Sequence, residues 1–339
     1  MKKELVVPIV RLEGSYKQIG KAQANQGQWS LFEQQMDWYK SMARHSDASE
    51  AIHLLGTYAP FLVEEITGLA DQLDMSLQQG VQIFSGYDMP FPEMGCSAFI
   101  HNSFYARNYD FSPDLYDGRL VIMKPENGFA SVGFSHQLVG RLDGMNEKGL
   151  VVGLHFVNDV PSKKGFLAPT LVRMVLDQCA TTAEAIDLLR KVPHGYCYNF
   201  SILDKMGEKG VVEAAPDHVA IRRGETLACT NHFQSNNLKA KNRTNITGSQ
   251  QRIIALEDFR QYDPPLEEAF RLLNHHASPL FSRDYDQFFG TLHTVVYCPD
   301  DQSVLVGIGE DTDPILITFK KEERFPRCAK GYLEYNVEK

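Results

Sequence analysis

The chain has 339 residues, and 43 aspartates and glutamates against 34 lysines and arginines leave a formal charge of −9 at neutral pH. Hydrophobic residues make up 43% and charged residues 23%, a globular composition that excludes disordered, collagen-like and disulfide-stapled miniprotein classes. At roughly 150 residues per domain, the length predicts about two units, or one large domain with an appendage. The acidic balance, without a long basic run, argues against nucleic acid or an anionic membrane as a partner.

Neither a membrane-spanning run nor a secretory leader is visible. The longest apolar stretches, such as 149–157, fall short of the about 20 residues that cross a bilayer, and the first eight residues have no apolar run of secretory length. The six cysteines are scattered without a CxxC pair, so neither disulfides nor a zinc knuckle is predicted. We therefore expect a cytoplasmic protein in which most cysteines are plain buried thiols.

The first 95 residues are predicted to be helical. Apolar residues recur near helical spacing over 15–44, and a second helix is predicted over 61–73. Ser76 has the side chain of an N-cap for a shorter helix over 77–84. No strand signal competes in this part of the sequence.

The character of the sequence changes after 87–92, where two prolines in three residues indicate an extended connection. Short runs rich in β-branched and aromatic residues follow, with the turn 101–103 typical of a hairpin. Strands are predicted at 96–100, 104–108, 120–123, 129–134, 150–156, 199–203, 211–214, 218–222, 227–230, 291–297, 303–308 and 315–319. Helices are predicted at 167–179, 182–190, 249–260 and 266–273. Clustered strands separated by paired helices favour an α+β class with antiparallel sheets covered by helices.

The sharpest chemical signal is Cys96, which follows Gly95 at the start of the predicted hairpin. If the two strands pair across the turn, Arg107 and Asp110 return past the cysteine. A guanidinium there favours a thiolate, and a carboxylate can hold a nearby amine. The alternative interpretation is a buried strand thiol beside an unrelated surface ion pair.

Five stretches carry a resemblance to a known family. They are Gly95-Cys96-Ser97-Ala98-Phe99 with Arg107-Asn108-Tyr109-Asp110, Asp143-Gly144-Met145-Asn146-Glu147-Lys148-Gly149-Leu150 with Gly153-Leu154-His155-Phe156, Thr230-Asn231-His232-Phe233, Ser249-Gln250-Gln251-Arg252, and the leader Glu13-Gly14-Ser15-Tyr16 with Ile19-Gly20. Together they resemble the N-terminal nucleophile hydrolases of the choloylglycine hydrolase and penicillin V acylase type. The most similar branch is that of the isopenicillin N acyltransferases.

The resemblance implies a four-layer αββα sandwich of two antiparallel sheets between helical layers. It also implies that residues 1–95 are a helical prosegment, the alpha subunit after cleavage, and that 96–339 are the catalytic domain. The chain would cut itself between Gly95 and Cys96, through attack of the thiol on the Gly95 carbonyl. The freed α-amine, with a pKa of about 7.7–8.0, would then serve as base for the thiol of the same residue.

The roles of the other site residues are likewise implied by the resemblance. Asp110 would hold the α-ammonium, and Arg107 would lie against the sulfur. The oxyanion hole would use the side-chain NH₂ of Asn231 and the backbone N–H of His155, where relatives carry asparagine or tyrosine. Arg252 would order the site through Asp110 or the cysteine.

Several alternatives stay open at this stage. The protein could be a cysteine amidohydrolase that cleaves a linear C–N amide bond, or an acyltransferase that passes the acyl group to an amine. It could also be an unprocessed binding protein on the same fold. A papain-like pair of Cys96 with His155 is a rival with little support. His275, His276 and His293 lack the i, i+4 pairing of a metalloprotease, so we expect neither a metal nor a cofactor. The expected partner is a small-molecule amide or acyl donor, with self-association left open.

Overall fold

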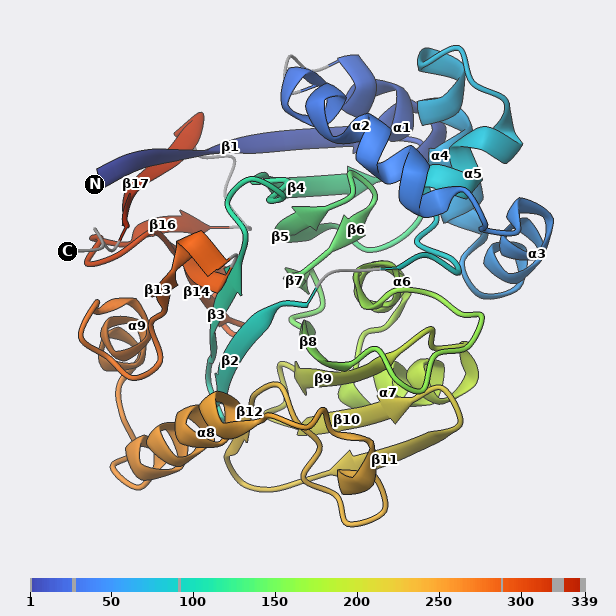
Figure 1. Ribbon diagram of the computed structural model, residues 1–339. Helices are drawn as coiled ribbons and strands as arrows, with labels where there is room; N and C mark the ends of the chain where they lie inside the picture. The colour runs from blue at the N-terminus through green and yellow to red at the C-terminus, as the bar shows by residue number, and fades with distance from the viewer. Residues whose placement is uncertain (1, 26–28, 91–92, 288, 319–325, 336–339) are drawn as a thin grey trace.

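The computed structural model describes residues 2–25, 29–90, 93–287, 289–318 and 326–335, with the side chains of 25–35 outside this description. One strand and five helices come before residue 95 (Figure 1). They are β1 (Lys2–Gly14), α1 (Tyr16–Asn25), α2 (Trp29–Ala43), α3 (Ala48–Tyr58), α4 (Pro60–Gln72) and α5 (Leu77–Phe84).

The larger sheet runs in the order β11-β10-β9-β8-β7-β5-β4-β1-β17, with β6 paired to β5. Its remaining strands are β4 (Leu120–Pro125), β5 (Ser131–His136), β6 (Gly140–Arg141), β7 (Asp143–Asn146), β8 (Val151–Asn158), β9 (Cys197–Leu203), β10 (Lys209–Ala215), β11 (His218–Arg222) and β17 (Cys328–Glu334). All of its pairs are antiparallel except β1 with β4.

The smaller sheet runs in the order β12-β2-β3-β14-β15-β16, with β13 paired to β14. Its strands are β2 (Gly95–Ile100), β3 (Tyr105–Phe111), β12 (Leu227–Cys229), β13 (Arg283–Asp284), β14 (Phe289–Cys298), β15 (Ser303–Ile308) and β16 (Ile315–Thr318). Every pair in this sheet is antiparallel.

The two sheets face each other, and helices cover their outer faces (Figure 1). Strand β2 contacts β8 and β9 across the interface. Helices α6 (Ala168–Gln178) and α7 (Thr182–Lys191) pack on the larger sheet, while α8 (Thr247–Arg260) and α9 (Leu266–Asn274) pack on the smaller one. This layering is the predicted αββα sandwich. The helices cover the outer faces of the two sheets, whose apolar side chains would otherwise be exposed to water.

Residue alternation along β2 sorts its side chains between two hydrophobic clusters. Cys96, Ala98 and Ile100 belong to the cluster between the sheets, whereas Phe99 belongs to the cluster beneath α8 and α9. Successive residues of a strand point to opposite faces, so this division follows from the pleat. The sulfur of residue 96 is therefore directed into the layer between the two sheets.

Local signals located the helices of the first 95 residues well, but the prediction of a purely helical segment was wrong at its start. Helix α5 begins after Ser76, whose hydroxyl accepts from the Gln79 amide while the Gln79 side chain accepts from the Ser76 amide, a full capping box. Residues 2–14 instead form β1, which lies between β4 and β17 in the larger sheet. Helix α3 was also missed.

The first 95 residues are joined to the rest of the molecule by buried polar contacts as well as by β1. Arg173 of α6 pairs with Glu65 of α4 at 2.5 Å and with Asp177 at 3.0 Å, and all three side chains are inaccessible to solvent. The Tyr16 hydroxyl donates to Asp177 at 3.0 Å. Such a network is satisfied only when both parts of the chain are in place.

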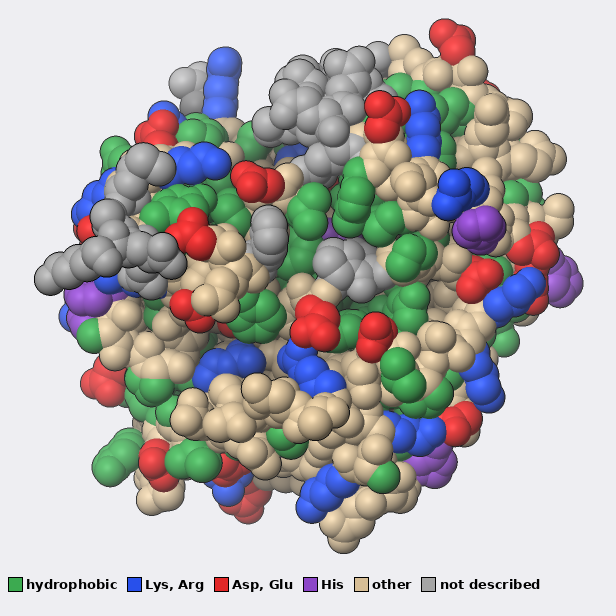
Figure 2. Space-filling view, in the orientation of Figure 1, with side chains coloured by type: hydrophobic (Ala, Val, Ile, Leu, Met, Phe, Trp, Pro, Cys, Tyr) green, Lys and Arg blue, Asp and Glu red, His purple; other side chains and the backbone are tan. Residues whose placement is uncertain are grey.

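One face of the molecule shows no strong segregation of charge (Figure 2). On the face in Figure 2, acidic and basic side chains are interspersed around scattered hydrophobic ones. Within the described residues, no helix combines the length and the apolar character needed to span a bilayer.

Candidate active site

The hairpin of β2 and β3 brings together the residues that its sequence predicted. The strands pair in a register that sets Gly95 opposite Asp110 and Ala98 opposite Arg107, and the turn closes with the His101 amide donating to the Phe104 carbonyl at 3.0 Å. Arg107 lies on the face of β3 that looks between the sheets. The predicted hairpin is confirmed, and it places the guanidinium beside Cys96.

The sulfur of Cys96 accepts a hydrogen bond from Nη2 of Arg107 at 3.0 Å. Both side chains are fully buried. The guanidinium is held from behind by the carboxylate of Asp143, with Nη1 at 3.1 Å from Oδ2, and by the carbonyl oxygens of Leu142 and Leu154 at 2.7 and 3.1 Å. The orientation of the cation is therefore fixed by the fold.

Gly153 makes the space for this arrangement. A Cβ at that position would lie 2.2 Å from the hydroxyl oxygen of Tyr105 and 2.8 Å from Nη1 of Arg107. Real carbon atoms do not approach that closely, so any side chain would displace the guanidinium. Gly153 therefore allows β8 to pack closely against Tyr105 and Arg107 of β3.

Burial and charge act in opposite directions on the thiol. Desolvation raises the pKa of Cys96 to about 11, while the Arg107 cation lowers it and the Asp110 carboxylate adds to the rise. Desolvation wins in the intact chain, so residue 96 is a thiol at neutral pH. The 3.0 Å contact agrees with the expectation that Arg107 lies against the sulfur, but the thiolate that its charge was expected to favour is not the main form in the intact chain.

Asn231 lies two residues after the end of β12, and its side chain binds the backbone of Cys96. Its Oδ1 accepts from the Cys96 amide at 2.8 Å and from Nη2 of Arg252 at 2.8 Å. Its Nδ2 donates to the carbonyl oxygens of Met94 at 3.2 Å and Phe156 at 2.8 Å. The NH₂ group is thus directed at the peptide that precedes the Gly95–Cys96 bond.

Arg252 reaches the next stretch of backbone, the Cys96–Ser97 peptide, from α8 on the outer side of the small sheet. Its Nη1 donates to the Cys96 carbonyl at 2.8 Å and to the Ser97 hydroxyl at 2.8 Å, and lies 3.5 Å from Oδ2 of Asp110. The three polar atoms of Cys96 are consequently held by three different residues: Sγ by Arg107, N by Asn231 and O by Arg252.

Asp110 lies next to Gly95, across the sheet from the sulfur. A Cβ on Gly95 would lie 2.8 Å from Oδ2 of Asp110 and 2.5 Å from the ring of Phe289, so only glycine fits there. The other carboxylate oxygen accepts from the Thr291 hydroxyl at 2.7 Å. Burial raises the pKa of Asp110, and Arg252 opposes that rise.

His155 lies on β8, facing the small sheet, with its ring beside the Cys96 backbone. Its Nε2 shares a hydrogen bond of 2.8 Å with the Ser201 hydroxyl, and burial holds the pKa of the imidazole well below its usual range. The sulfur takes its hydrogen bond from Arg107 instead, so the described contacts do not favour a papain-like pair of Cys96 with His155.

Other site features were missed or misplaced by sequence reasoning. His293, considered in the sequence only as a possible metal ligand, is buried on β14, where its ring stacks on Phe134 at 3.6 Å and its Nε2 lies 3.6 Å from Asp143. Asp143 and Thr291 had no predicted role, although Asp143 belongs to one of the stretches that carried the resemblance. Alternation along β14 places His293 and Val295 on one face, which was a signal that could have indicated burial.

A cavity of about 950 Å³ lies between α8 and the segment 232–246. Its lining includes His232, which is the residue after Asn231, together with Arg243 and Ile253. Arg243 pairs with Glu93 at 2.5 Å, and its guanidinium lies 5.9 Å from the centre of the Phe156 ring. The segment just before Cys96 is thus tied to the rim of this cavity.

Several solved structures are similar to this chain. A mutant of conjugated bile acid hydrolase from Clostridium perfringens is 15% identical with a TM-score of 0.46, over 72% of this chain and 97% of its own. Penicillin V acylase from Agrobacterium tumefaciens is 18% identical with a TM-score of 0.45, over 67% and 86%. The Caenorhabditis elegans ortholog of N-acylethanolamine-hydrolyzing acid amidase is 15% identical with a TM-score of 0.40, over 60% and 93%.

Among curated proteins, none matches this chain in sequence. The family model described as acyl-coenzyme A:6-aminopenicillanic acid acyl-transferase matches residues 100–312. The matched range covers well over half of the chain and contains Arg107, Asp110, His155, Asn231 and Arg252, while Cys96 lies just before it. The chain belongs to the acyl-coenzyme A:6-aminopenicillanic acid acyl-transferase family.

Proposed function

We propose that this protein is an autoprocessing cysteine amidohydrolase that acts on a linear C–N amide bond through a thioester on Cys96. The observation that carries the proposal is the convergence on this residue of Arg107 at the sulfur, Asn231 at the amide nitrogen and Arg252 at the carbonyl oxygen. A buried strand residue normally satisfies its backbone N–H and C=O through neighbouring strands, whereas at Cys96 two side chains bind these groups and a guanidinium binds the sulfur.

The first step would be cleavage of the chain itself. The Cys96 sulfur attacks the Gly95 carbonyl carbon, the C–N bond breaks, and the thiol proton ends on the nitrogen, which becomes a free amine. Water then hydrolyses the thioester and releases the Gly95 carboxylate and the thiol. The boundary that follows separates a prosegment, residues 1–95, from a catalytic chain, 96–339.

Cleavage would convert the groups around the bond into a catalytic site. The new α-amine, with a pKa of about 7.7–8.0, can take the proton of the thiol at neutral pH, and Asp110 can hold it when charged. The NH₂ group of Asn231 now donates to the Met94 carbonyl, and departure of that segment leaves it free to stabilise an oxyanion. The backbone N–H of His155 is the proposed second donor.

Release of the same segment would also free Arg243 from its ion pair with Glu93. The cavity beside α8 is then the site that we assign to part of a small-molecule substrate. Ile246, Ile253 and Ile254 give it apolar walls, while Lys239 and Arg243 give it positive charge.

The family match favours a second candidate, acyl transfer, because the two reactions share every step as far as the thioester and differ only in whether water or an amine attacks it. Turnover of a simple N-acyl amide, with and without an added primary amine, separates them. Free acid alone supports the hydrolase, and a new N-acyl product that grows with amine concentration supports the transferase. No turnover of any acyl amide by the cleaved protein, with Cys96→Ala as the blank, would contradict both.

A further inference from the structure

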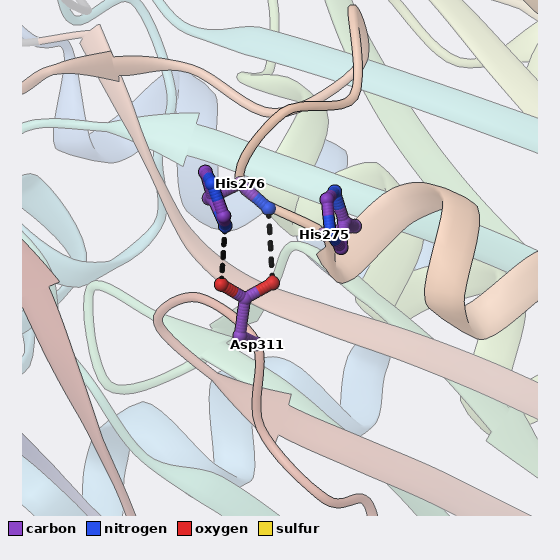
Figure 3. A group of neighbouring side chains, drawn as sticks. All are labelled: His275, His276 and Asp311. Carbon is purple, nitrogen blue, oxygen red and sulfur yellow. Dashed lines mark hydrogen bonds and ion pairs between the residues drawn. The ribbon is translucent and has the colours of Figure 1, made fainter.

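A second group of potential ligands lies away from Cys96, at the far end of α9. His275 and His276 follow the last residue of this helix, and Asp311 lies in the connection between β15 and β16. One donor atom from each of the three side chains lies within 4.8 Å of the other two. Figure 3 shows the two imidazole rings side by side near the Asp311 carboxylate, which bonds to His276.

The spacing of these residues is built into the fold. Asn274 is buried and makes three hydrogen bonds to this connection. Its backbone carbonyl accepts from the Asp311 amide at 3.0 Å, and its Oδ1 accepts from the Thr312 amide at 2.7 Å. Its Nδ2 donates to the Gly309 carbonyl at 2.8 Å. Asp311 itself is held at a φ of 49°, a left-handed conformation that costs a non-glycine residue free energy. The loop is therefore fixed against the helix end, with its carboxylate presented to the histidines.

The present contacts already bring the donors together. The His276 amide donates to Oδ1 of Asp311 at 3.1 Å, and its ring Nδ1 forms a short hydrogen bond with Oδ2 (Figure 3). The His275 ring stacks on that of His276 with their centres 4.7 Å apart. A metal ion would take the place of the proton between His276 and Asp311, and a small rotation of the stacked ring would add the third ligand.

The surroundings suit a cation with open coordination positions. A cavity of about 300 Å³ adjoins the group, and its walls include the carboxylates of Glu267, Asp311 and Asp313 against the single cation of Arg271. Excess negative charge at a site raises the local concentration of cations. The cavity gives room for the water molecules that would complete the coordination shell.

We propose that His275, His276 and Asp311 form a binding site for one divalent transition-metal ion of the zinc class. Two imidazole nitrogens and one carboxylate oxygen suit Zn²⁺, Co²⁺ or Ni²⁺, whereas Ca²⁺ and Mg²⁺ prefer oxygen ligands throughout. The ion would clamp the end of α9 to the β15–β16 connection. The sequence predicted no metal here because it could not connect these histidines with Asp311, which lies 35 positions further along the chain than His276.

The site should be tested on the full chain without a polyhistidine tag. Titration with Zn²⁺ followed by calorimetry should give saturable binding of one ion per chain, and Co²⁺ should produce visible absorption of a nitrogen- and oxygen-ligated ion. Both signals should be present equally in Cys96→Ala, which keeps the inference independent of the proposed enzymatic function. Mg²⁺ in excess should not displace either ion.

Variants decide between this site and adventitious binding. His276→Ala and Asp311→Asn should weaken Zn²⁺ binding by about 10- to 100-fold or more, since each removes a ligand. His218→Ala, which removes a surface histidine elsewhere, should leave it unchanged. Metal-free thermal unfolding checks that each variant is folded, and His275→Gln gives a second test if one is not. Absence of one-to-one binding, or equal binding by wild type and all three site variants, would overturn the proposal.

Discussion

The guanidinium of Arg107 lies 3.0 Å from the sulfur of Cys96, and neither side chain has any contact with solvent. Their contact is worth more in this dry layer than it would be at the surface, because little water screens it. The exclusion of water also raises the pKa of the thiol, and the positive charge of the arginine offsets part of that rise. The balance between these two effects leads to the first prediction.

Cleavage of the intact chain should become faster as the pH rises from about 7 to about 9. The pKa of Cys96 is raised to about 11, so throughout this range the thiol is mostly protonated and its reactive thiolate grows about tenfold per pH unit. Arg107→Gln removes the cation that lowers this pKa, so it should slow cleavage at every pH. The rate at which the large fragment appears, followed by mass spectrometry over a pH series, measures this. A rate that falls with pH would contradict it.

Asn231→Ala should slow turnover by the cleaved enzyme by about 10² to 10³-fold, corresponding to about 2.7–4 kcal/mol of lost oxyanion stabilisation. The loss should fall on kcat rather than on KM, because the NH₂ group donates to charge that develops only during the reaction. Steady-state kinetics with an N-acyl amide measure it. Asn237→Ala, at an exposed asparagine, is the control, and equal activity of the two variants would remove Asn231 from the proposed oxyanion hole.

Gly153→Ala should impair both processing and activity. Its Cβ would lie 2.8 Å from Nη1 of Arg107 and 2.2 Å from the Tyr105 hydroxyl, which forces the guanidinium away from the sulfur. Gly56→Ala in α3 is a matched control, since nothing lies within 4 Å of its added carbon and alanine favours a helix by about 1 kcal/mol. Rates of cleavage and unfolding temperatures of both variants measure the effect. Normal processing in Gly153→Ala would show that the position of Arg107 does not matter.

Residues 1–95 should stay bound to the rest of the molecule after cleavage, because β1 lies inside the larger sheet and Glu65 pairs with Arg173 in the interior. Glu65→Ala leaves the arginine without its closest partner and should lower the free energy of unfolding by about 3–5 kcal/mol. Denaturant unfolding and size-exclusion chromatography measure stability and co-elution. Asp71→Asn, which breaks an exposed pair with Lys17, should change neither. Separation of the wild-type fragments in native buffer would contradict the prediction.

Elements set by local chemistry were predictable from sequence. Helix α5 begins where Ser76 and Gln79 cap each other, and α7 begins where the Thr181 hydroxyl accepts from the Glu184 amide. The Glu184 carboxylate accepts in turn from the Ala180 amide. Strand β1 could not be found in the same way, since its partner β17 lies at the other end of the chain and its half-exposed face gives a weak pattern.

The same division applies to the site. The β2–β3 hairpin is local, so its turn and strand pattern predicted that Arg107 and Asp110 would return to Cys96. Thr291, which donates to Asp110 at 2.7 Å, comes from a strand whose place in the sheet depends on long-range pairing. Helix α8 brings Arg252 to the Cys96 backbone from the far side of the sheet, and only the family resemblance connected those two residues in advance.

The most direct test of the central claim is the intact mass of the purified protein after incubation. Cleavage before Cys96 predicts that the 38.3 kDa chain gives fragments of about 11 and 28 kDa in proportion to their lengths, the larger beginning with that cysteine. Cys96→Ala should stay at full length, whereas Cys179→Ala, which removes a buried thiol at the end of α6, should cleave normally. A wild-type chain that stays at 38.3 kDa while hydrolysing an amide, or a cut elsewhere than before Cys96, would contradict the account.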